Sequence, residues 1–191
     1  MKNIITAIIL LFSLSITAQE KPYEKELPVN DSGLIDFTEV VKVDGASSFE
    51  LYSRAREWFV TTFNSAEAVL QMDDKESGKL IGKAFSDIVT PAGFTPITDK
   101  LHYTLSIYLK DGRYKYSITS LQIQQYPSTS SPSPEKNPIE YLVITNRFKK
   151  NGKIRPYSAA VRSAMIRSVE GLILEIKSAM ESKPGDSDDD W

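Results

Sequence analysis

Few residues in this chain could perform acid–base or nucleophilic chemistry. His102 is the only histidine, and the sequence contains no cysteine. His102 falls on the polar side of an alternating strand, which predicts that it faces solvent or a shallow groove. The serines form neither Gly-x-Ser-x-Gly nor Ser-x-x-Lys in a position that would activate a hydroxyl. We therefore predict no catalytic residue, and a hydrolase that uses His102 or Asp and Glu side chains is the alternative.

Metal and phosphate ligands are also scarce. A transition-metal site would need cysteine or several histidines, which this chain lacks. Asp73, Asp74 and Glu76 form an acidic turn, but they lack the alternating ligand spacing of an EF-hand. No helix start follows the glycines that could form a phosphate loop, namely Gly78, Gly82 and Gly93. The sequence predicts neither a metal ion nor a cofactor.

Two features favour binding instead of catalysis. Tyr108 lies on the polar side of its strand and could line a groove. A second feature is a stretch without any acid between Tyr141 and Val169, for which an anionic envelope surface or an acidic partner is the natural counterpart. Its predicted binding residues are Arg147, Lys149, Lys150, Lys153 and Arg155.

The first half of the chain contains the elements that would position these residues. Ile35 to Val43 is rich in β-branched residues and predicts a strand. Ser47 followed by Glu50 has the form of a capping box, and an aromatic stripe at helical spacing follows it. Glu67 to Met72 and Lys79 to Val89 predict a hairpin.

The clearest hairpin surrounds Asp111-Gly112. Apolar and polar residues alternate from Leu101 to Lys110, and pairing Lys110 with Arg113 makes one face of both strands apolar. The alternation changes parity after Ile118, which predicts a bulge near Thr119 or Ser120.

The last third begins with a Pro- and Ser-rich insertion at 126–138, which we expect to be flexible. Ile139 to Phe148 is interpreted as a strand, Asn151-Gly152 as a tight turn and Ser158 to Glu181 as a long helix. The predicted fold is α+β with an antiparallel sheet in β-α-β-β-β-β-α order, helices on one face, and an extra strand or hairpin before the C-terminal helix.

Residues 36–120 resemble a bacterial family of unknown function with a TBP-like fold, after the TATA-binding protein. The resemblance implies this fold and an exported setting, but it brings no catalytic residues. It rests on Leu51-Tyr52, Trp58-Phe59, Phe63, Ser65, Gly78-Lys79-Leu80-Ile81-Gly82-Lys83 and Asp111-Gly112-Arg113-Tyr114.

The N-terminus predicts export. Residues 1–18 have a lysine, a short apolar run and a small residue at Ala18, as a cleaved signal peptide does. The absence of cysteine excludes a lipoprotein anchor, and no transmembrane segment is expected in the mature chain. We expect a soluble protein in the periplasm or outside the cell. Its predicted parts are an extension at 19–33, one domain at 34–182 and an acidic, disordered tail at 183–191.

The net charge of the domain argues against a nucleic-acid partner. Between Leu34 and Ser182 there are 19 Lys and Arg against 17 Asp and Glu, and DNA binding by a TBP-like sheet would need a strongly basic face. The sequence therefore predicts an exported, non-catalytic binding module for an envelope protein or small ligand. A lipid or small-molecule carrier with a helix-grip-like cavity is a further alternative.

Overall fold

The computed structural model describes residues 26–63, 65–91, 95–125 and 135–182. The predicted signal peptide, most of the 19–33 extension, most of the 126–138 insertion and the acidic tail lie outside the described residues. These parts of the chain stay predictions.

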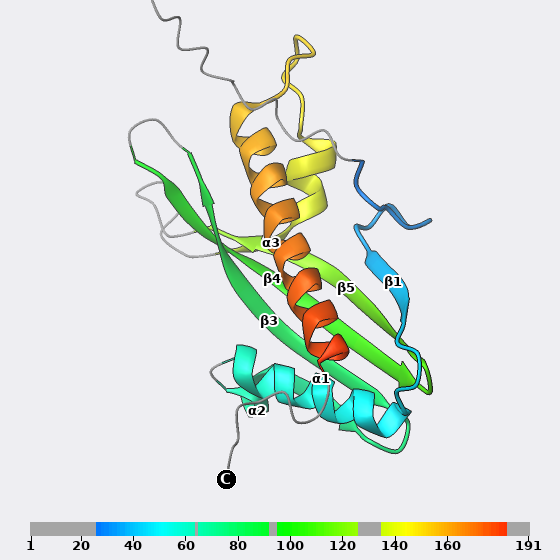
Figure 1. The fold of residues 1–191 in the computed structure, drawn as a ribbon. Helices are drawn as coiled ribbons and strands as arrows, with labels where there is room; N and C mark the ends of the chain where they lie inside the picture. The colour runs from blue at the N-terminus through cyan, green and yellow to red at the C-terminus, as the bar shows by residue number, and fades with distance from the viewer. Residues whose placement is uncertain (1–25, 64, 92–94, 126–134, 183–191) are drawn as a thin grey trace, which may run out of the picture.

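The structure confirms an α+β fold built on an antiparallel sheet. The sheet has six strands. Five of them follow the order β1-β5-β4-β3-β2, and β6 pairs with the edge of β5 that also pairs with β1. Two helices, α1 and α3, lie against the sheet (Figure 1). The strands are β1 (Phe37–Lys42), β2 (Leu70–Asp74), β3 (Lys79–Thr90), β4 (Ile97–Lys110), β5 (Arg113–Gln124) and β6 (Lys136–Pro138). The helical segments are α1 (Ser48–Thr62), α2 (Ala66–Val69), η1 (Tyr141–Thr145) and α3 (Pro156–Glu181).

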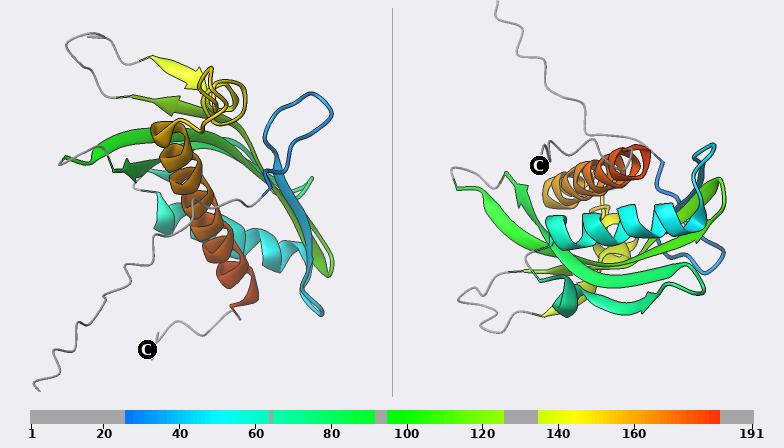
Figure 2. Two further views of the ribbon diagram at one scale, coloured as in Figure 1. Left: turned by 90° about the horizontal axis from the view of Figure 1, so that it is seen from above. Right: turned by 60° about the horizontal axis from the view of Figure 1, so that its bottom comes forward.

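Helices α1 and α3 cover the same face of the sheet, and the sheet curves around them (Figure 2). The predicted cap of α1 is confirmed, because the backbone N–H of Glu50 donates to Ser47 Oγ at 3.2 Å. The aromatic stripe of α1 faces inward, with Phe59 fully buried and Trp58 6% exposed. The apolar stripe of α3 is buried over the same strands. The core therefore lies between the helices and one face of the sheet.

The central hairpin has the predicted register. Lys110 pairs with Arg113, Leu109 with Tyr114 and Ile107 with Tyr116. Gly112 has φ +72°, a conformation that the tight turn requires and that glycine adopts without steric cost. The register shifts between His102 and Thr104, opposite Ser120. The predicted bulge therefore restores the alternation, and Leu121 and Ile123 are buried with the earlier apolar residues.

The interpretation of Ile139 to Phe148 as a strand was wrong. The extra strand is β6, which ends at Pro138, and the following residues form the helical turn η1. Ile139 and Val143 are fully buried, and their spacing of four residues suits one face of a helix. The Asn151-Gly152 turn is confirmed, since Phe148 and Ile154 form an antiparallel bridge around it.

The strand predicted from Glu67 to Met72 begins later than expected. Ala66–Val69 forms the short helix α2, and β2 starts at Leu70. Ser65 provides the reason, because its hydroxyl accepts the N–H of Ala68 at 3.3 Å and so caps a helical turn.

Candidate binding face

The face of the sheet that the helices leave uncovered is called the open face. Successive side chains along a strand point to opposite faces of the sheet. The residues that alternate with the buried ones therefore point to the open face. The cross-strand register places them in rows that run across β1, β5, β4 and β3. At the end nearest the β4–β5 turn, one row holds Lys42, Arg113 and Lys110, and the next holds Val40, Lys115, Tyr108 and Lys79.

Positive charge is concentrated on this face. Apart from β6, its seven Lys and Arg side chains compare with three acids, Asp36, Asp74 and Asp87. Lys136 on β6 adds an eighth base. Helices α1 and α3, on the other side, carry five Glu against five Lys and Arg. The near-neutral charge of the whole domain therefore hides a basic surface. The seven are Lys42, Lys79, Lys83, Lys100, Lys110, Arg113 and Lys115.

Tyr108 lies at the centre of the cationic end. Lys79 and Lys115 are its cross-strand neighbours on β3 and β5, with their Nζ atoms 5.8 and 4.6 Å from the centre of its ring. The half-buried Tyr108 borders a hollow of about 350 Å³. We call it the Tyr108 hollow; its lining residues are Val40, Tyr108, Lys110, Arg113, Tyr114 and Lys115.

Like charges face one another beside this hollow. Arg113 is directly opposite Lys42 on one side and Lys110 on the other, an arrangement that destabilises a sheet. No described residue forms an ion pair with these three side chains. The row is therefore well placed to hold an anion, which would relieve the repulsion.

A second aromatic group lies at the opposite end of the open face. Phe85 on β3 is 48% exposed, and its ring centre lies 4.0 Å from Lys100 Nζ and 5.4 Å from the ring centre of His102. His102 Nε2 hydrogen-bonds Gln124 Oε1 at 2.7 Å. Burial and the nearby Lys136 and Lys100 lower the pKa of His102, although Gln124 opposes this effect.

Between the two aromatic groups the middle of the open face carries several hydroxyl side chains. Thr38, Ser117, Ser106 and Ile81 form one row, and the next holds Thr119, Thr104 and Lys83. Thr38 Oγ1 donates to Ser117 Oγ at 2.8 Å. Asp36 Oδ1 accepts from both Thr38 and Ser117, and Ser106 is only 9% exposed. Thr104 and Thr119 therefore offer their hydroxyls to a polar ligand as donors and acceptors.

The basic hairpin predicted from the sequence, residues 147–155, lies elsewhere. It precedes α3, at the end of the molecule opposite the β4–β5 turn (Figure 1). Lys149, Lys150 and Lys153 are exposed, whereas Arg147 is half-buried with its guanidinium 5.4 Å from the ring centre of Phe148. The structure therefore separates this hairpin from Tyr108.

Arg155 and Arg162, two arginines of the acid-free stretch, also differ in exposure. Arg155 is exposed, and its Nε donates to the carbonyl of Phe148 at 3.3 Å. Arg162 belongs to α3 and is only 7% exposed, so it is not part of a solvated basic surface. Burial and the charge of Arg147 lower its pKa.

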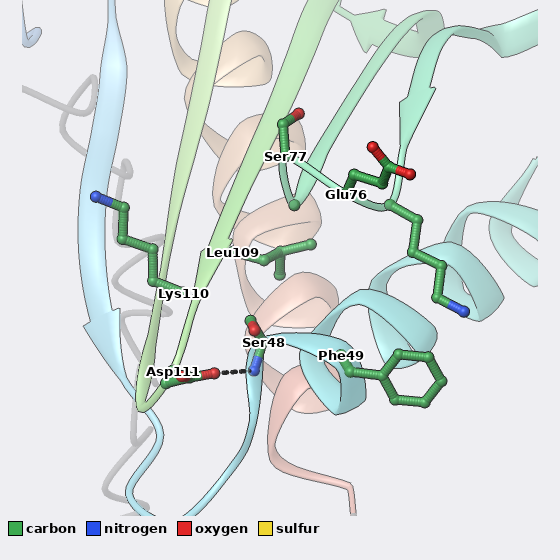
Figure 3. A pocket seen from close by; sticks show the side chains of 9 residues that line it. Ser48, Phe49, Glu76, Ser77, Leu109, Lys110 and Asp111 are labelled. Carbon is green, nitrogen blue, oxygen red and sulfur yellow. Dashed lines mark hydrogen bonds between the residues drawn. The ribbon is translucent and has the colours of Figure 1, made fainter.

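A larger hollow of about 600 Å³ lies where the β2–β3 turn, the β4–β5 turn and the start of α1 meet (Figure 3). Asp111 points to the helix start and accepts the N–H of Ser48 at 2.7 Å. Leu109 N–H donates to the carbonyl of Gly78 at 2.8 Å. The charges that line the hollow are balanced, Lys75 and Lys110 against Glu76 and Asp111. These contacts hold three segments together, so we assign the hollow a structural role.

Tyr157, a half-buried residue in the first turn of α3, belongs to a polar cluster at the edge of the core. Its hydroxyl donates to Asp99 Oδ2 at 2.8 Å and accepts from Gln125 Nε2 at 2.7 Å. Burial and then the Asp99 bond raise the pKa of Tyr157 to about 12, against the opposing effect of Gln125. The tyrosine remains a donor at neutral pH and joins α3 to β4 and β5.

The described residues contain no group of three or more His, Cys, Asp or Glu side chains that could hold a metal ion. Among the described helices, none is both long and apolar enough to cross a membrane.

Sequence reasoning missed the cations of the open face because they come from four strands and are dispersed along 74 positions from Lys42 to Lys115. A usable signal was present. Each of them occupies the polar position in the alternation of its strand, so a correct strand order would have brought them together.

The sequence matches one family model, and the fold matches solved structures. Residues 37–124 match the family model described as "Domain of unknown function (DUF4468) with TBP-like fold". A DUF4468 family protein from Bacteroides ovatus is similar in structure with a TM-score of 0.64 and 14% identity, and the match covers 83% of this chain and 92% of that one. For a TBP-like protein from Parabacteroides distasonis the TM-score is 0.65, the identity 15% and the coverage 83% and 99%. No curated protein matches the sequence.

Proposed function

Residues 37–124 form a domain of the DUF4468 family with a TBP-like fold, and on this premise we propose that the chain is an exported, non-catalytic module that binds an anionic ligand on its open face. The family name and the fold say nothing of a ligand. The proposal therefore depends on the side chains of this chain.

The observation that carries the proposal is the row of Lys42, Arg113 and Lys110 beside the Tyr108 hollow. Three cations placed side by side without ion-pair partners among the described residues lower stability. An anion that binds between them gains charge-assisted hydrogen bonds from all three.

The geometry gives less support to the hydrolase alternative. A general base needs a nucleophile within hydrogen-bond reach, and a third group that holds the base in the right orientation. The hydrogen-bond partner of His102 is the amide of Gln124, and among the described residues no carboxylate contacts the imidazole. A hydrolase would lose its turnover in His102→Ala, whereas we expect this variant to keep the wild-type affinity for a short anion at the Tyr108 hollow.

Paired charge reversals test the proposal. We expect Lys110→Glu/Arg113→Glu to weaken binding of trigalacturonate, a short oligomer with three carboxylates, by at least about tenfold. The matched control is Lys149→Glu/Lys150→Glu, which makes the same charge change on the basic hairpin and should leave the affinity unchanged. Calorimetric titration measures both.

The control also decides between the two basic regions. If Lys149→Glu/Lys150→Glu loses binding and Lys110→Glu/Arg113→Glu keeps it, the hairpin is the site and the proposal for the open face is wrong. If the wild type does not bind the trimer at all, anion binding at the Tyr108 hollow is rejected.

Export is tested separately from binding. We expect cell fractionation of the full-length chain to find it outside the cytoplasm, with a mature N-terminus near Gln19. Deletion of residues 2–18 should leave the chain in the cytoplasm. An exported chain that still begins at Met1 would contradict the predicted cleavage.

A further inference from the structure

The open face has features well beyond the Tyr108 hollow that a small anion would not use. Bases continue along the sheet through Lys83 and Lys100 to Lys136, which pairs with Gln124 at the far end. Tyr108 and His102 are six residues apart on β4, which corresponds to roughly 20 Å along an extended strand. Two aromatic groups with adjacent lysines thus stand at the two ends of one continuous surface.

From this arrangement we infer that the ligand is an extended anionic polysaccharide that lies along β4 and contacts both ends of the open face. This inference rests on the proposed function and names the class of ligand. The bases follow one another along the strand direction, as the repeated charges of a linear polyanion require. A single small anion would need only the cluster at Lys110 and Arg113.

The middle of the face favours a carbohydrate over other polyanions. It has accessible hydroxyls at Thr38, Ser117, Thr104 and Thr119 and the carboxylate of Asp36 as a further acceptor. These groups match the hydroxyls of sugars as donors and acceptors. Binding of single-stranded nucleic acid relies on aromatic side chains for successive bases, and no aromatic side chain lies in these rows.

A lipid surface would require a different arrangement. Side chains that enter a membrane interface are apolar and form a continuous face. The exposed apolar residues of the open face are Val40 on β1, Met72 on β2, and Phe85 and Val89 on β3. They form no continuous apolar face, since Lys83 and Asp87 occupy the open-face positions on either side of Phe85. The face is also convex, because the sheet curves toward the helices on its other side (Figure 2). A long chain can follow such a surface without a deep pocket.

The length of the ligand provides the test. We expect the wild type to bind dodecagalacturonate at least about tenfold more tightly than trigalacturonate, compared per trimer unit, because only the longer oligomer reaches both ends. Neutral dextran should not bind. In Lys83→Gln/Lys100→Gln the advantage of the dodecamer should fall to less than about threefold, while the affinity for the trimer is unchanged. Lys149→Gln/Lys150→Gln is the matched control and should behave as the wild type. Thermal unfolding verifies that each variant is folded.

The outcomes separate this inference from the proposed function. If the trimer binds and the dodecamer has no advantage, the extended ligand is wrong and the anion site remains. If neither binds, both are rejected. Tighter binding of a twelve-residue oligothymidylate, or of vesicles that contain phosphatidylglycerol, would overturn the polysaccharide in favour of nucleic acid or lipid.

Discussion

The two faces of the sheet are formed by the same strands but differ in what their side chains do. One face buries apolar side chains, and the other exposes neighbouring like charges. On the covered face of β4, Leu101, Leu105 and Ile107 are fully buried beneath α1 and α3. On the open face the same strand presents His102, Tyr108 and Lys110, with rows of like charge beside them. Burial of apolar area on the covered face stabilises the fold. On the open face, the neighbouring like charges lower that stability. This difference is why we place function on the open face.

The largest expected effect is a loss of core packing. Leu105→Ala should lower the free energy of unfolding by about 2 to 5 kcal/mol, because it leaves a cavity against the helices. Thr104→Ala, one residue away on the open face, should change it by less than about 0.5 kcal/mol. Urea denaturation of both variants measures the contrast. Similar losses in the two would show that the open face is also part of the core.

The next effect concerns a glycine that lets a helix approach the sheet. A Cβ on Gly82 would lie 2.7 Å from Phe59 Cε1 and 3.1 Å from Val69 Cγ1. Phe59 is fully buried and contacts the rings of Trp58 and Phe63, so it cannot yield easily. Gly82→Ala should therefore cost about 1 to 3 kcal/mol of unfolding free energy, as measured by urea denaturation.

Gly171→Ala is the matched control for this overpacking. Gly171 lies in α3, and no described atom of another segment lies within 4 Å of the position that an added Cβ would take. Alanine favours a helix over glycine by up to about 1 kcal/mol, so the same substitution should stabilise the protein there. A Gly82→Ala variant as stable as the wild type would mean that α1 does not pack closely on β3.

A smaller effect of opposite sign is expected on the open face. Arg113→Gln removes the central charge between Lys42 and Lys110 and should raise the unfolding free energy by up to about 0.5 kcal/mol at low salt. The gain should disappear in 1 M NaCl, where the Debye length falls to about 3 Å. Lys149→Gln on the basic hairpin is the control. A loss of stability in Arg113→Gln would refute the repulsion that underlies the proposed site.

The smallest effects concern pH, and Glu39 and His102 provide one example on each face. On the covered side, Lys177 and the Tyr116 hydroxyl hydrogen-bond Glu39 and lower its pKa below 4.5. The ionised Glu39 therefore stabilises the fold, and this stabilisation is complete above pH 4.5 and is lost as the pH falls through the lowered pKa. Glu39→Gln should therefore flatten the decline of stability below pH 4.5, as followed by thermal unfolding.

His102 on the open face acts at a higher pH. Its pKa is lowered from 6.5, chiefly by burial, so the unfolded chain binds the proton more readily than the folded one. Stability should fall as the pH drops below 6.5, and His102→Gln should remove that decline. A variant with the same slope as the wild type between about pH 6.5 and 5 would show that His102 does not titrate in this way.

Much of the fold was predictable because the signals are local. The Asp111-Gly112 turn and the alternation on both sides of it determine the register of β4 and β5. The Ser47 cap and the spacing of Trp58 and Phe59 determine α1 and its buried face. The segment with Ile139 and Val143 was predicted as a strand because a short apolar run is compatible with a strand or a helix. Burial of both side chains in the folded domain favours the helical turn η1.

The candidate site depended on long-range pairing. Lys149 and Lys150 are adjacent in the chain, so the sequence alone shows that they form a basic cluster. Lys42 and Arg113 become neighbours only because β1 pairs with β5, across 71 positions of the chain.

The sequence by itself therefore determined which side of each strand is apolar and which residues turn the chain, because these depend on the alternation and on backbone preferences of adjacent residues. Only the tertiary structure decided that the cations of separate strands share one uncovered face with Tyr108. The physical reason is that strand order and helix placement minimise the exposed apolar area of the whole domain, and the charges on the opposite face are brought together as a consequence.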